Sequence, residues 1–537
     1  MMKGKPPAIL AQGADADKPA PSAAGGLARA ATLMAAATVA SRVLGLLREI
    51  VAAALFGATD AKAAYVIAYY VPFFVQRLLL GGTLSIVFIP TITRYLARGE
   101  QDEARAVSAN LFTIVLLLGL AMAAAGQLIA PLIVPLAAPG FAASPGLIEL
   151  AVHLTRIIFV AMVFLALSVY VTGFLQAHQS FTVPALAPLV FNVVIIAGTL
   201  VLGVRYGITG LAVSWILGTA AQFLVQLPQA RRRGLRFGRP DLRHPAITAL
   251  GRLAVPAMLG LAVVEINAYV GRFFASFVPA TAGTNAVAVL DYAYEVVQAP
   301  AGIFAVSIAT AIFPLLSAHA AADARGEVRA TAMLALRTLL VIILPVAGFA
   351  IALREPLIRV LFERGLFTGR ATSAVASAMA AYALGLPAIA AYYVLTRAYY
   401  ALHDMVTPVR IGVGMIALNA ALDYLLMRVW GATGIALATS IVATANAGAL
   451  LYLLRRRLQG VEGRRVGSTL LRAGCAAVVS GGIMAASAGA VGPAAVAQLL
   501  AGGAAGAASY LLLARLLRVD ELAVAWGMVR RRGAVVR

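Results

Sequence analysis

Residues 207–212, Gly-Ile-Thr-Gly-Leu-Ala, recur 224 positions later as residues 431–436, Gly-Ala-Thr-Gly-Ile-Ala. The same offset pairs Pro90 with Pro314, Pro184 with Pro408, and the arginine triplet at 231–233 with that at 455–457. A single offset kept over so long a stretch indicates an internal duplication. Each copy contains six apolar stretches, and an even number gives the two copies the same orientation about an axis along the membrane normal. The sequence therefore predicts two six-helix lobes around a central cavity.

The composition excludes an ordinary soluble domain, because 62% of the 537 residues are hydrophobic and only 12% are charged. The apolar runs are about 20 residues long rather than alternating segments of about ten, which favours helices over a membrane β-barrel. We expect fourteen transmembrane helices, the last two near 468–490 and 493–516. The predicted fold is an all-α polytopic membrane protein with two repeated six-helix lobes plus two C-terminal helices.

The predicted domain boundaries follow the apolar runs and the basic segments between them. In chain order we expect a disordered cytoplasmic tail at 1–28, an N-terminal lobe at 29–230, a basic cytoplasmic linker at 231–247, a C-terminal lobe at 248–456, two extra helices at 457–517 and a basic cytoplasmic tail at 518–537.

Arginine carries nearly all of the formal charge of +22, since the chain has only four lysines. The basic clusters fall on one side of the predicted spans, so the positive-inside rule places that side and both termini in the cytoplasm. These clusters explain the charge without nucleic acid as a partner. The loop at 354–370, with four arginines, falls on the other side and is the exception. The single Cys475 excludes an internal disulfide, which favours the bacterial cytoplasmic membrane.

The first predicted span carries charges at residues 38–57, Thr-Val-Ala-Ser-Arg-Val-Leu-Gly-Leu-Leu-Arg-Glu-Ile-Val-Ala-Ala-Ala-Leu-Phe-Gly. A charge at bilayer depth costs at least about 2.5–3.5 kcal/mol, so such groups normally face a protein interior or a wet cavity. Arg42 and Arg48 therefore predict a buried anion site, because guanidinium groups bind phosphate in a bidentate manner. Glu49 lies seven residues after Arg42, so these two share a helix face.

Further basic candidates in the first half are Arg77, His153 and Arg156. The alternative is a structural role, in which these arginines pair with carboxylates of the other lobe. The candidate partners are Glu265, Asp291 and Glu295.

The second half holds acidic candidates instead. Asn419 and Asp423 lie four residues apart and share a helix face, where Glu265, Asn267 and Thr439 are in a position to approach them. Oxygen ligands of this kind suit a hard cation such as Na⁺, and a proton is equally compatible. The alternative is a hydrogen-bond network between helices.

Several motifs of enzymes do not occur in the chain. There is no P-loop, since the lysines stand only at positions 3, 5, 18 and 62, and there is no metalloprotease motif or Cys-His cluster. We therefore expect no enzyme and no cofactor. The driving force would be an ion gradient, the membrane potential or the flux of substrate.

Motifs spread from the first to the twelfth span resemble those of one family. They are Ser41-Arg42-Val43-Leu44-Gly45 with Arg48, Phe88-Ile89-Pro90, Pro139-Gly140-Phe141, Pro184-Ala185-Leu186-Ala187-Pro188 with Asn192, Glu363-Arg364-Gly365 with Phe367, and Arg397-Ala398-Tyr399-Tyr400-Ala401 with Thr407-Pro408. The chain resembles the lipid II flippase family, MurJ/MviN. The resemblance implies alternating access that moves undecaprenyl-diphosphate-linked peptidoglycan precursor from the cytoplasmic to the periplasmic leaflet, with the last two helices forming a groove for the lipid tail.

The resemblance implies substrate contacts at Arg42 and Arg48, with Glu49 beside them. The chain departs from the family in two spans, where paired arginines become Gln76 and Arg77, an arginine becomes Glu295 and a glutamate becomes Gln298; the family's loop aspartate falls on Ala63, close to Asp60. The cation site of sodium-coupled members is retained at Asn419, Asp423 and Thr439, with Ile435 at the backbone-carbonyl position and Glu265 as the acid of the seventh span.

Lipid II or a related polyprenyl-diphosphate lipid is thus the expected partner, together with the bilayer and proteins of cell-wall synthesis. The departures leave two alternatives open. One is a divergent exporter of another polyprenyl-linked saccharide or amphiphile, motivated by Glu295 and Gln298. The other is a non-transporting membrane scaffold of the cell-wall machinery.

Overall fold

A computed structural model describes residues 21–80, 88–245, 247–248, 269–281 and 283–522, and within these ranges the side chains of 21–35 and 75–80 are not described. The described part of the chain is helical, with a single isolated bridge between Thr281 and Thr284 in place of any strand. The all-α prediction is therefore confirmed. Residues 1–20 of the predicted tail at 1–28, residues 249–268 of the seventh span predicted near 248–278, and residues 523–537 lie outside the described residues. Helix α1 (Pro21–Phe56) begins within the range predicted as a disordered tail.

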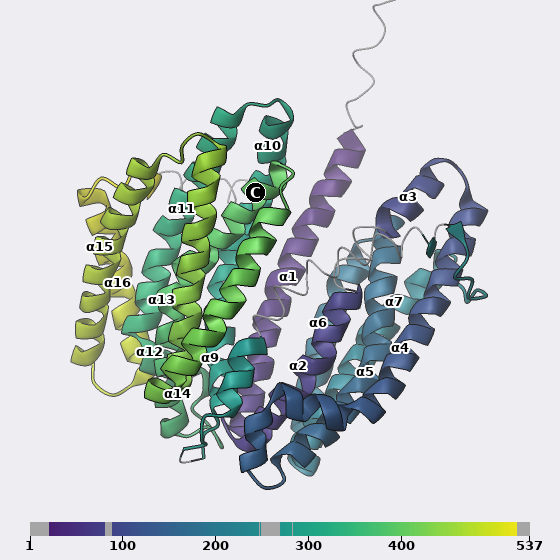
Figure 1. The fold of residues 1–537 in the computed structure, drawn as a ribbon, viewed down its shortest axis with the longest axis horizontal. Helices are drawn as coiled ribbons and strands as arrows, with labels where there is room; N and C mark the ends of the chain where they lie inside the picture. Colours follow the sequence, from purple (N-terminus) through teal and green to yellow (C-terminus); the bar gives the residue numbers. More distant parts are fainter. Residues whose placement is uncertain (1–20, 81–87, 246, 249–268, 282, 523–537) are drawn as a thin grey trace, which may run out of the picture.

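The N-terminal lobe is the group of helices on the right of Figure 1, with α1 along its inner side. α1 packs mainly on α6, and α2 packs mainly on α5. The helices are α1 (Pro21–Phe56), α2 (Asp60–Leu80), the short α3 (Ile89–Ala97), α4 (Gln101–Ala137), the 3₁₀ turn η2 (Pro139–Ala143), α5 (Leu147–Ala177), α6 (Thr182–Gly198), the π-helical η3 (Thr199–Gly203) and α7 (Val204–Arg232).

The C-terminal lobe is the group on the left of Figure 1, and the last two helices cover its outer side. α15 packs on α11, where the Tyr510 hydroxyl of α16 also donates to the Val341 carbonyl at 2.7 Å. The helices are α9 (Ala286–Pro300), the π-helical η4 (Ala301–Ala305), α10 (Val306–Ala321), α11 (Arg325–Ala352), α12 (Arg354–Phe362), α13 (Gly369–Ala401), α14 (Val406–Arg457), α15 (Gly463–Ala490) and α16 (Ala495–Leu516).

The duplication is visible in the backbone at its most distinctive positions. Gly207 and Gly431 each interrupt a long helix with a positive φ, at φ 61° and ψ −144° in one lobe and φ 53° and ψ −129° in the other. An L side chain is disfavoured in this region, so glycine is needed at both kinks. Gly210 and Gly434 follow three residues later, and each lets the helix after the kink approach a backbone carbonyl of the helix before it, that of Leu202 or Leu426. The predicted repeat is confirmed.

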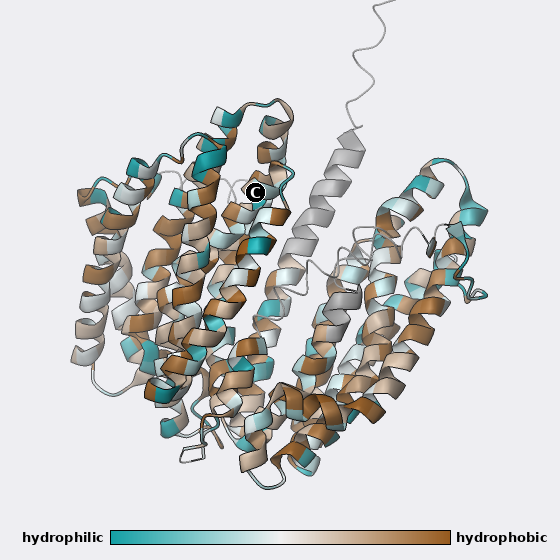
Figure 2. Cartoon of the chain, viewed as in Figure 1, coloured by the Kyte–Doolittle hydropathy of each residue, from teal (hydrophilic) through white to brown (hydrophobic). Residues whose placement is uncertain are grey.

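Nine helical stretches of the described residues are long and apolar enough to cross a membrane. Two of them, Thr182–Arg232 and Val406–Arg457, are the helices that contain the glycine kinks. Hydrophilic residues gather at the helix ends in Figure 2, around α3 and above α10, whereas apolar residues cover the middle of the helices. The chain is a multispan membrane protein, and the count of fourteen spans stays a prediction.

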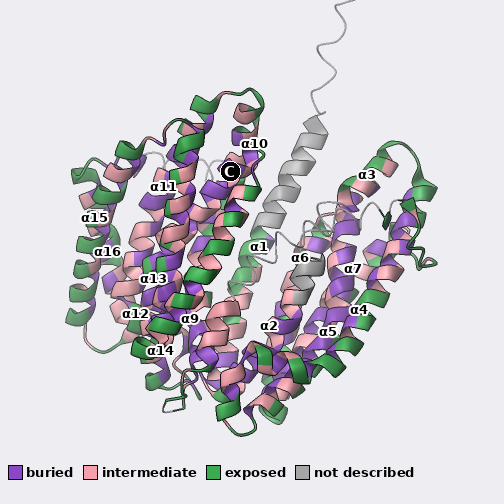
Figure 3. Ribbon diagram, viewed as in Figure 1, coloured by how far each residue is buried: buried purple, intermediate pink, exposed green. Residues whose placement is uncertain are grey.

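The centre of each lobe is formed by its most buried helix, α5 in the N-terminal lobe and α13 in the C-terminal lobe (Figure 3). Both are rich in small residues. Gly385 of α13 is an example, because a side chain there would collide with Ser440 of α14. Such small residues allow helices to pack closely without a hydrophobic driving force between them.

The two lobes meet at one end of the molecule through backbone hydrogen bonds, and we call this region the sealed end. The Leu366 amide donates to the Ala54 carbonyl at 2.9 Å, and the Asn285 amide donates to the Ala58 carbonyl at 2.8 Å. The Asn285 side chain also donates to Asp60 at 2.8 Å. The sealed end includes the arginine-rich loop at 354–370, since Leu366 lies in it.

Two glycines make the close approach at the sealed end possible. Gly57 has φ +59° and Gly365 has φ +58°, and a side chain at Gly365 would collide with the Ala54 carbonyl. Another contact joins the lobes at the same end, where the Gly140 amide donates to the Ser276 hydroxyl at 3.1 Å. The fold therefore places α1 and α2 against α9 at this end, and it is there that the charged residues of the first span meet the other lobe.

Candidate functional site

Arg42 lies on the exposed part of α1 that faces the C-terminal lobe. Its guanidinium group lies directly against Gly302 in η4, where a side chain would occupy the same space. α1 is held on the other side by α6, since the Asn192 amide donates to the Ser41 carbonyl at 3.4 Å. Arg42 thus presents its charge in the space between the lobes, as an anion site would need.

Arg48 has a different environment from Arg42. Its guanidinium pairs with Glu49 at 2.9 Å and lies 5.5 Å from the ring centroid of Trp215 in α7. The sequence indicated that Glu49 shares a face with Arg42. The pair forms nevertheless between Arg48 and Glu49, because two long side chains bridge the roughly 100° that separates consecutive helix positions.

Lys62 is the centre of the charged cluster, and its side chain is only 1% exposed. Its ammonium group lies 3.0 Å from Glu49 on α1 and 3.5 Å from Asp291 on α9. It also lies 4.7 Å from the ring centroid of Tyr292. A buried ammonium is stable only with partners of this kind, so Lys62 ties together three helices from both lobes.

Asp291 is shared between several donors. It accepts a hydrogen bond from the Tyr69 hydroxyl at 2.9 Å, and Arg272 lies 3.8 Å from the same carboxylate. The Arg272 guanidinium in turn stacks 3.5 Å above the ring of Tyr70 and donates to its hydroxyl. The acidic group therefore faces one lysine, one arginine and one tyrosine, most of them on α2.

The expected substrate residues of the eighth span lie nearby but outside this cluster. Glu295 is exposed toward the space between the lobes, and within the described residues it forms no ion pair with Arg42 or Arg48. Gln298 donates to the Tyr294 hydroxyl at 2.5 Å. The Gln76 and Arg77 side chains lie outside the described residues, so their roles stay predictions.

Two basic candidates of the first half point elsewhere. His153 and Arg156 are exposed on α5, and Arg156 donates to the Gln127 carbonyl of α4 at 3.1 Å. Arg156 therefore makes a contact within the N-terminal lobe. The structure brings Arg48 and Glu49 together with residues that the sequence did not select, namely Lys62 and Arg272. One signal was available for Lys62, since it is the only lysine of the chain beyond the N-terminal tail.

The expected cation ligands come together in α14, which places the eleventh and twelfth predicted spans side by side through the kink at Gly431. The Asn419 amide donates to Asp423 at 3.0 Å, and both side chains are buried. The only side-chain oxygen of Asn419 and the second carboxylate oxygen of Asp423, both Oδ1, have no hydrogen-bond partner among the described residues.

The other two positions of this expected site lie on the second half of α14. Thr439 donates to the Ile435 carbonyl at 3.2 Å, and Ile435 and Asp423 both lie beside Gly271. Glu265 lies outside the described residues. Buried oxygens without a partner suit a hard cation or a proton, so the residues present fit the expected ligand.

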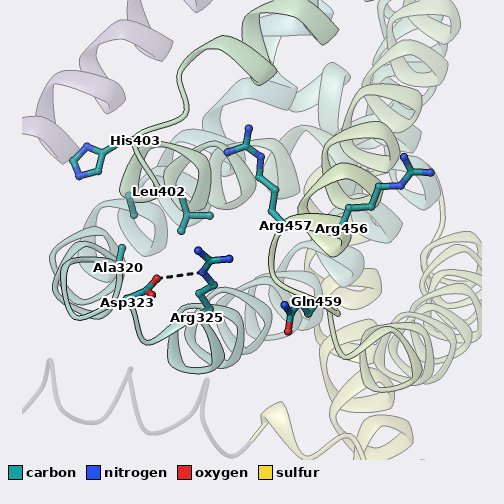
Figure 4. Close-up of a pocket in the computed structure, with 9 residues that line it drawn as sticks. Ala320, Asp323, Arg325, Leu402, His403, Arg456, Arg457 and Gln459 are labelled. Carbon is teal, nitrogen blue, oxygen red and sulfur yellow. Dashed lines mark hydrogen bonds and ion pairs between the residues drawn. The ribbon is translucent and has the colours of Figure 1, made fainter.

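A separate cavity of about 450 Å³ lies at the opposite end of the C-terminal lobe from the sealed end, between the α10–α11 loop, the α13–α14 loop and the end of α14. Figure 4 shows Arg325 paired with Asp323 inside it, at 3.2 Å. Arg457 pairs with Asp404 at 2.8 Å, and Arg456 bonds the Tyr452 hydroxyl. Its three arginines already have partners, so this cavity is not the candidate site.

Comparison with known proteins gives the family of the chain. Residues 52–502 match the family model described as lipid II flippase MurJ. The chain belongs to the MurJ family. Its relatives include the lipid II flippase MurJ of Burkholderia cenocepacia, 30% identical over 80% of this chain and 84% of the relative. The probable lipid II flippase MurJ of Vibrio cholerae is 31% identical over 81% of this chain and 84% of the relative. The family resemblance expected from the motifs is thus confirmed.

Solved structures agree with the MurJ assignment. A lipid II flippase MurJ in an inward closed conformation superimposes with a TM-score of 0.77 at 25% identity, covering 91% of this chain and all of that one. An inward-facing multidrug resistance transporter of the MATE family is similar in fold alone, with a TM-score of 0.65 at 15% identity over 79% of this chain and 95% of the other. The two-lobed fold is therefore that of MurJ and is shared with a transporter of other substrates.

Proposed function

We propose that this MurJ-family chain translocates undecaprenyl-diphosphate-linked peptidoglycan precursor, lipid II, across the bacterial cytoplasmic membrane by alternating access. The observation that carries the proposal is Arg42, a guanidinium presented between the lobes against the bare backbone of Gly302. A guanidinium binds a diphosphate well, since its planar donors match phosphate oxygens. Arg48 lies nearly two turns further along α1 and would enter the same site when it leaves Glu49.

The orientation follows from the charge of the loops. The arginine triplets that end α7 and α14 lie at the end of the molecule opposite the sealed end. The positive-inside rule makes that end cytoplasmic, together with both termini. The sealed end is then periplasmic, and the structure corresponds to a state in which substrate enters from the cytoplasmic leaflet.

Asn419, Asp423, Ile435 and Thr439 would hold a Na⁺ ion or a proton that couples transport to the ion gradient. Support comes from the buried Oδ1 atoms of Asn419 and Asp423, which lack partners among the described residues. When bound, the cation would compensate the buried carboxylate. The chain's own groups supply the oxygen ligands and exclude water, since Asp423 is 0% exposed.

A second candidate function is the export of another polyprenyl-linked saccharide. The observation that favours it is Glu295, which is exposed and stands where the family has an arginine, since a carboxylate accepts hydrogen bonds from saccharide hydroxyls. The lipid and diphosphate parts of such a substrate would be unchanged, and only the saccharide contacts would differ.

Reconstitution into proteoliposomes distinguishes the two candidates. Fluorescent lipid II and a polyprenyl-diphosphate carrying a different saccharide are each placed in the outer leaflet, and their movement to the inner leaflet is measured. Faster flipping of lipid II supports the first function, and faster flipping of the other lipid supports the second. Flipping of neither lipid by folded protein would contradict both.

A further inference from the structure

Lys62 occupies a position that none of the expected substrate or cation residues explains. It lies on α2, faces away from the lipid and is in contact with Glu49 of its own lobe. The same ammonium lies 3.5 Å from Asp291 of the other lobe. Lys62 is therefore a charged group that belongs to both lobes at once.

The other bonds between the lobes near Lys62 are weaker than the Lys62–Asp291 pair. The other bonds between the lobes among the described residues of this region have at most one charged partner. The Tyr292 hydroxyl donates to the Gly57 carbonyl at 3.2 Å, the Tyr69 hydroxyl donates to Asp291, and Arg272 donates to the Tyr70 hydroxyl. The Asp60–Asn285 bond involves one charged partner. The pair between Lys62 and Asp291 has two charged partners, and both are buried, so it is screened least by water and salt.

We propose that the Lys62–Asp291 pair is the latch of the sealed end, which must open each time the lobes separate there. The proposal rests on the proposed alternating access and names residues for the step in which the periplasmic side opens. The other groups of the cluster make this opening feasible. When the lobes part, Lys62 keeps Glu49, and Asp291 keeps Arg272, so that neither charge is left buried without a partner.

The same arrangement makes the latch testable without loss of the fold. In Lys62→Met, Glu49 still pairs with Arg48, and Asp291 still accepts from Tyr69. In Asp291→Asn, Lys62 still pairs with Glu49, and the shape of the side chain is nearly unchanged. Each variant removes the pair between the lobes together with a different pair within one lobe, Lys62–Glu49 in Lys62→Met and Arg272–Asp291 in Asp291→Asn. An effect that both variants share therefore reports the pair between the lobes.

The opening of the sealed end is measured by thiol labelling. The only cysteine, Cys475, is exposed and is replaced by serine. Ala58, which is 2% exposed between the lobes, is replaced by cysteine. Purified full-length protein in lipid nanodiscs is treated with a hydrophilic maleimide, and the labelling rate of the introduced thiol reports how often the sealed end opens. Because no lipid II is present, the result is independent of whether the proposed substrate is right.

The latch predicts that Lys62→Met and Asp291→Asn each raise the labelling rate at least fivefold. The double variant should label no faster than the faster single variant, since both remove the same pair. Arg457→Gln is the matched control, because it breaks an ion pair of 2.8 Å within the C-terminal lobe and should leave the rate unchanged.

Unchanged labelling in both single variants, or equal acceleration by Arg457→Gln, would overturn the proposal. Additive acceleration in the double variant would also do so. Thermal unfolding of each variant excludes a general loss of stability as the cause. Should Lys62→Met not fold, Asp291→Asn and its double-variant partner Lys62→Gln carry the same comparison.

Discussion

The two lobes have the same backbone conformation at their kinked helices, but the side chains at equivalent positions of those helices differ in kind. Gly207 and Gly431 bend the chain in the same way, yet Asn419 and Asp423 in the C-terminal lobe stand where the N-terminal lobe has Ile195 and Thr199. Thr199 satisfies its hydroxyl within its own helix, by donating to the Ile195 carbonyl at 2.7 Å. The duplicated positions thus explain the fold, and the positions that have diverged indicate where an ion would bind.

The charged residues where the lobes meet also differ in net sign from one lobe to the other. In the N-terminal lobe the cations Arg42, Arg48 and Lys62 outnumber Glu49. In the C-terminal lobe the carboxylates of Asp291 and Glu295 outnumber Arg272. Opposite charge on the two inner faces draws the lobes together in the absence of substrate. An anionic substrate would compete with the carboxylates for these cations, which couples binding to the separation of the lobes.

The largest effect is expected from substitutions of the glycines that both lobes have after their kinks. Gly210→Ala and Gly434→Ala each place a methyl group against a backbone carbonyl of the helix before the kink, that of Leu202 or Leu426. A backbone carbonyl cannot move aside as a flexible side chain can. Each should lower the free energy of unfolding by about 1–3 kcal/mol, as overpacking does. Thermal denaturation in detergent checks this, with Gly414→Ala in α14, where nothing lies close, as control. A large loss in one lobe alone would contradict the structural equivalence.

The next effect concerns the basic inner face. Arg42→Ala should lower lipid II flipping in proteoliposomes at least tenfold, which corresponds to about 1.4 kcal/mol, because it removes a diphosphate contact. Arg42→Lys should restore part of the rate, since it keeps the charge without the bidentate geometry. Arg464→Ala, exposed at the start of α15, is the control for a general loss of positive charge. Full activity of Arg42→Ala would refute the anion site.

A smaller effect is expected at Asp423, where the two lobes differ in residue type. Asp423→Asn should lower flipping about threefold, roughly 0.7 kcal/mol, and make it indifferent to replacement of Na⁺ or to a pH gradient. The matched change in the N-terminal lobe, Thr199→Val, should leave the response to the gradient intact. A gradient response that survives in Asp423→Asn would show that the ion acts elsewhere.

The smallest effect is expected at Asp404, which lies outside the membrane in the loop between α13 and α14. Burial acts to raise the pKa of Asp404, but hydrogen bonds from the Thr407 hydroxyl and from the amides of Thr407 and Val406, together with Arg457, hold that pKa below its ordinary value. A lowered pKa stabilises the fold fully above the ordinary value of about 3.9, and the benefit disappears as the pH falls through the lower folded value.

Asp404→Asn should therefore lower stability by about 0.5 kcal/mol near neutral pH and by less as the pH falls below about 4. Ser180 stands at the equivalent position of the N-terminal lobe, and its amide bonds Leu175 as that of Asp404 bonds Tyr399. Ser180→Ala should show no such pH dependence. Melting curves from about pH 3 to pH 7, a range that brackets the ordinary carboxyl pKa, measure both variants, and an equal pH response of the two would contradict the assignment.

The helix boundaries could be predicted from the sequence because they depend on local composition. The repeat could be predicted because its residues recur at one fixed offset. The predicted spans near 468–490 and 493–516 agree closely with α15 (Gly463–Ala490) and α16 (Ala495–Leu516). Asn419 and Asp423 were found by their spacing along one helix, and their contact at 3.0 Å depends only on that spacing.

The charge cluster could be predicted only in part. Arg48 was selected because it stands in an apolar span, but its pairing with Glu49 depends on the rotamers of two long side chains. Lys62 meets Asp291, and Arg272 meets Tyr70, only where the two lobes come together. That contact is set by packing over hundreds of residues, so no local pattern reveals it.

Rescue of bacteria depleted of their own lipid II flippase tests the central claim most directly. The full chain is expressed from a plasmid, its insertion in the membrane is verified, and growth after depletion is measured beside the Arg42→Ala variant. We predict that the unaltered chain restores growth and cell shape and that Arg42→Ala does not. Lysis of cells that contain the unaltered chain in the membrane at normal levels would contradict lipid II translocation.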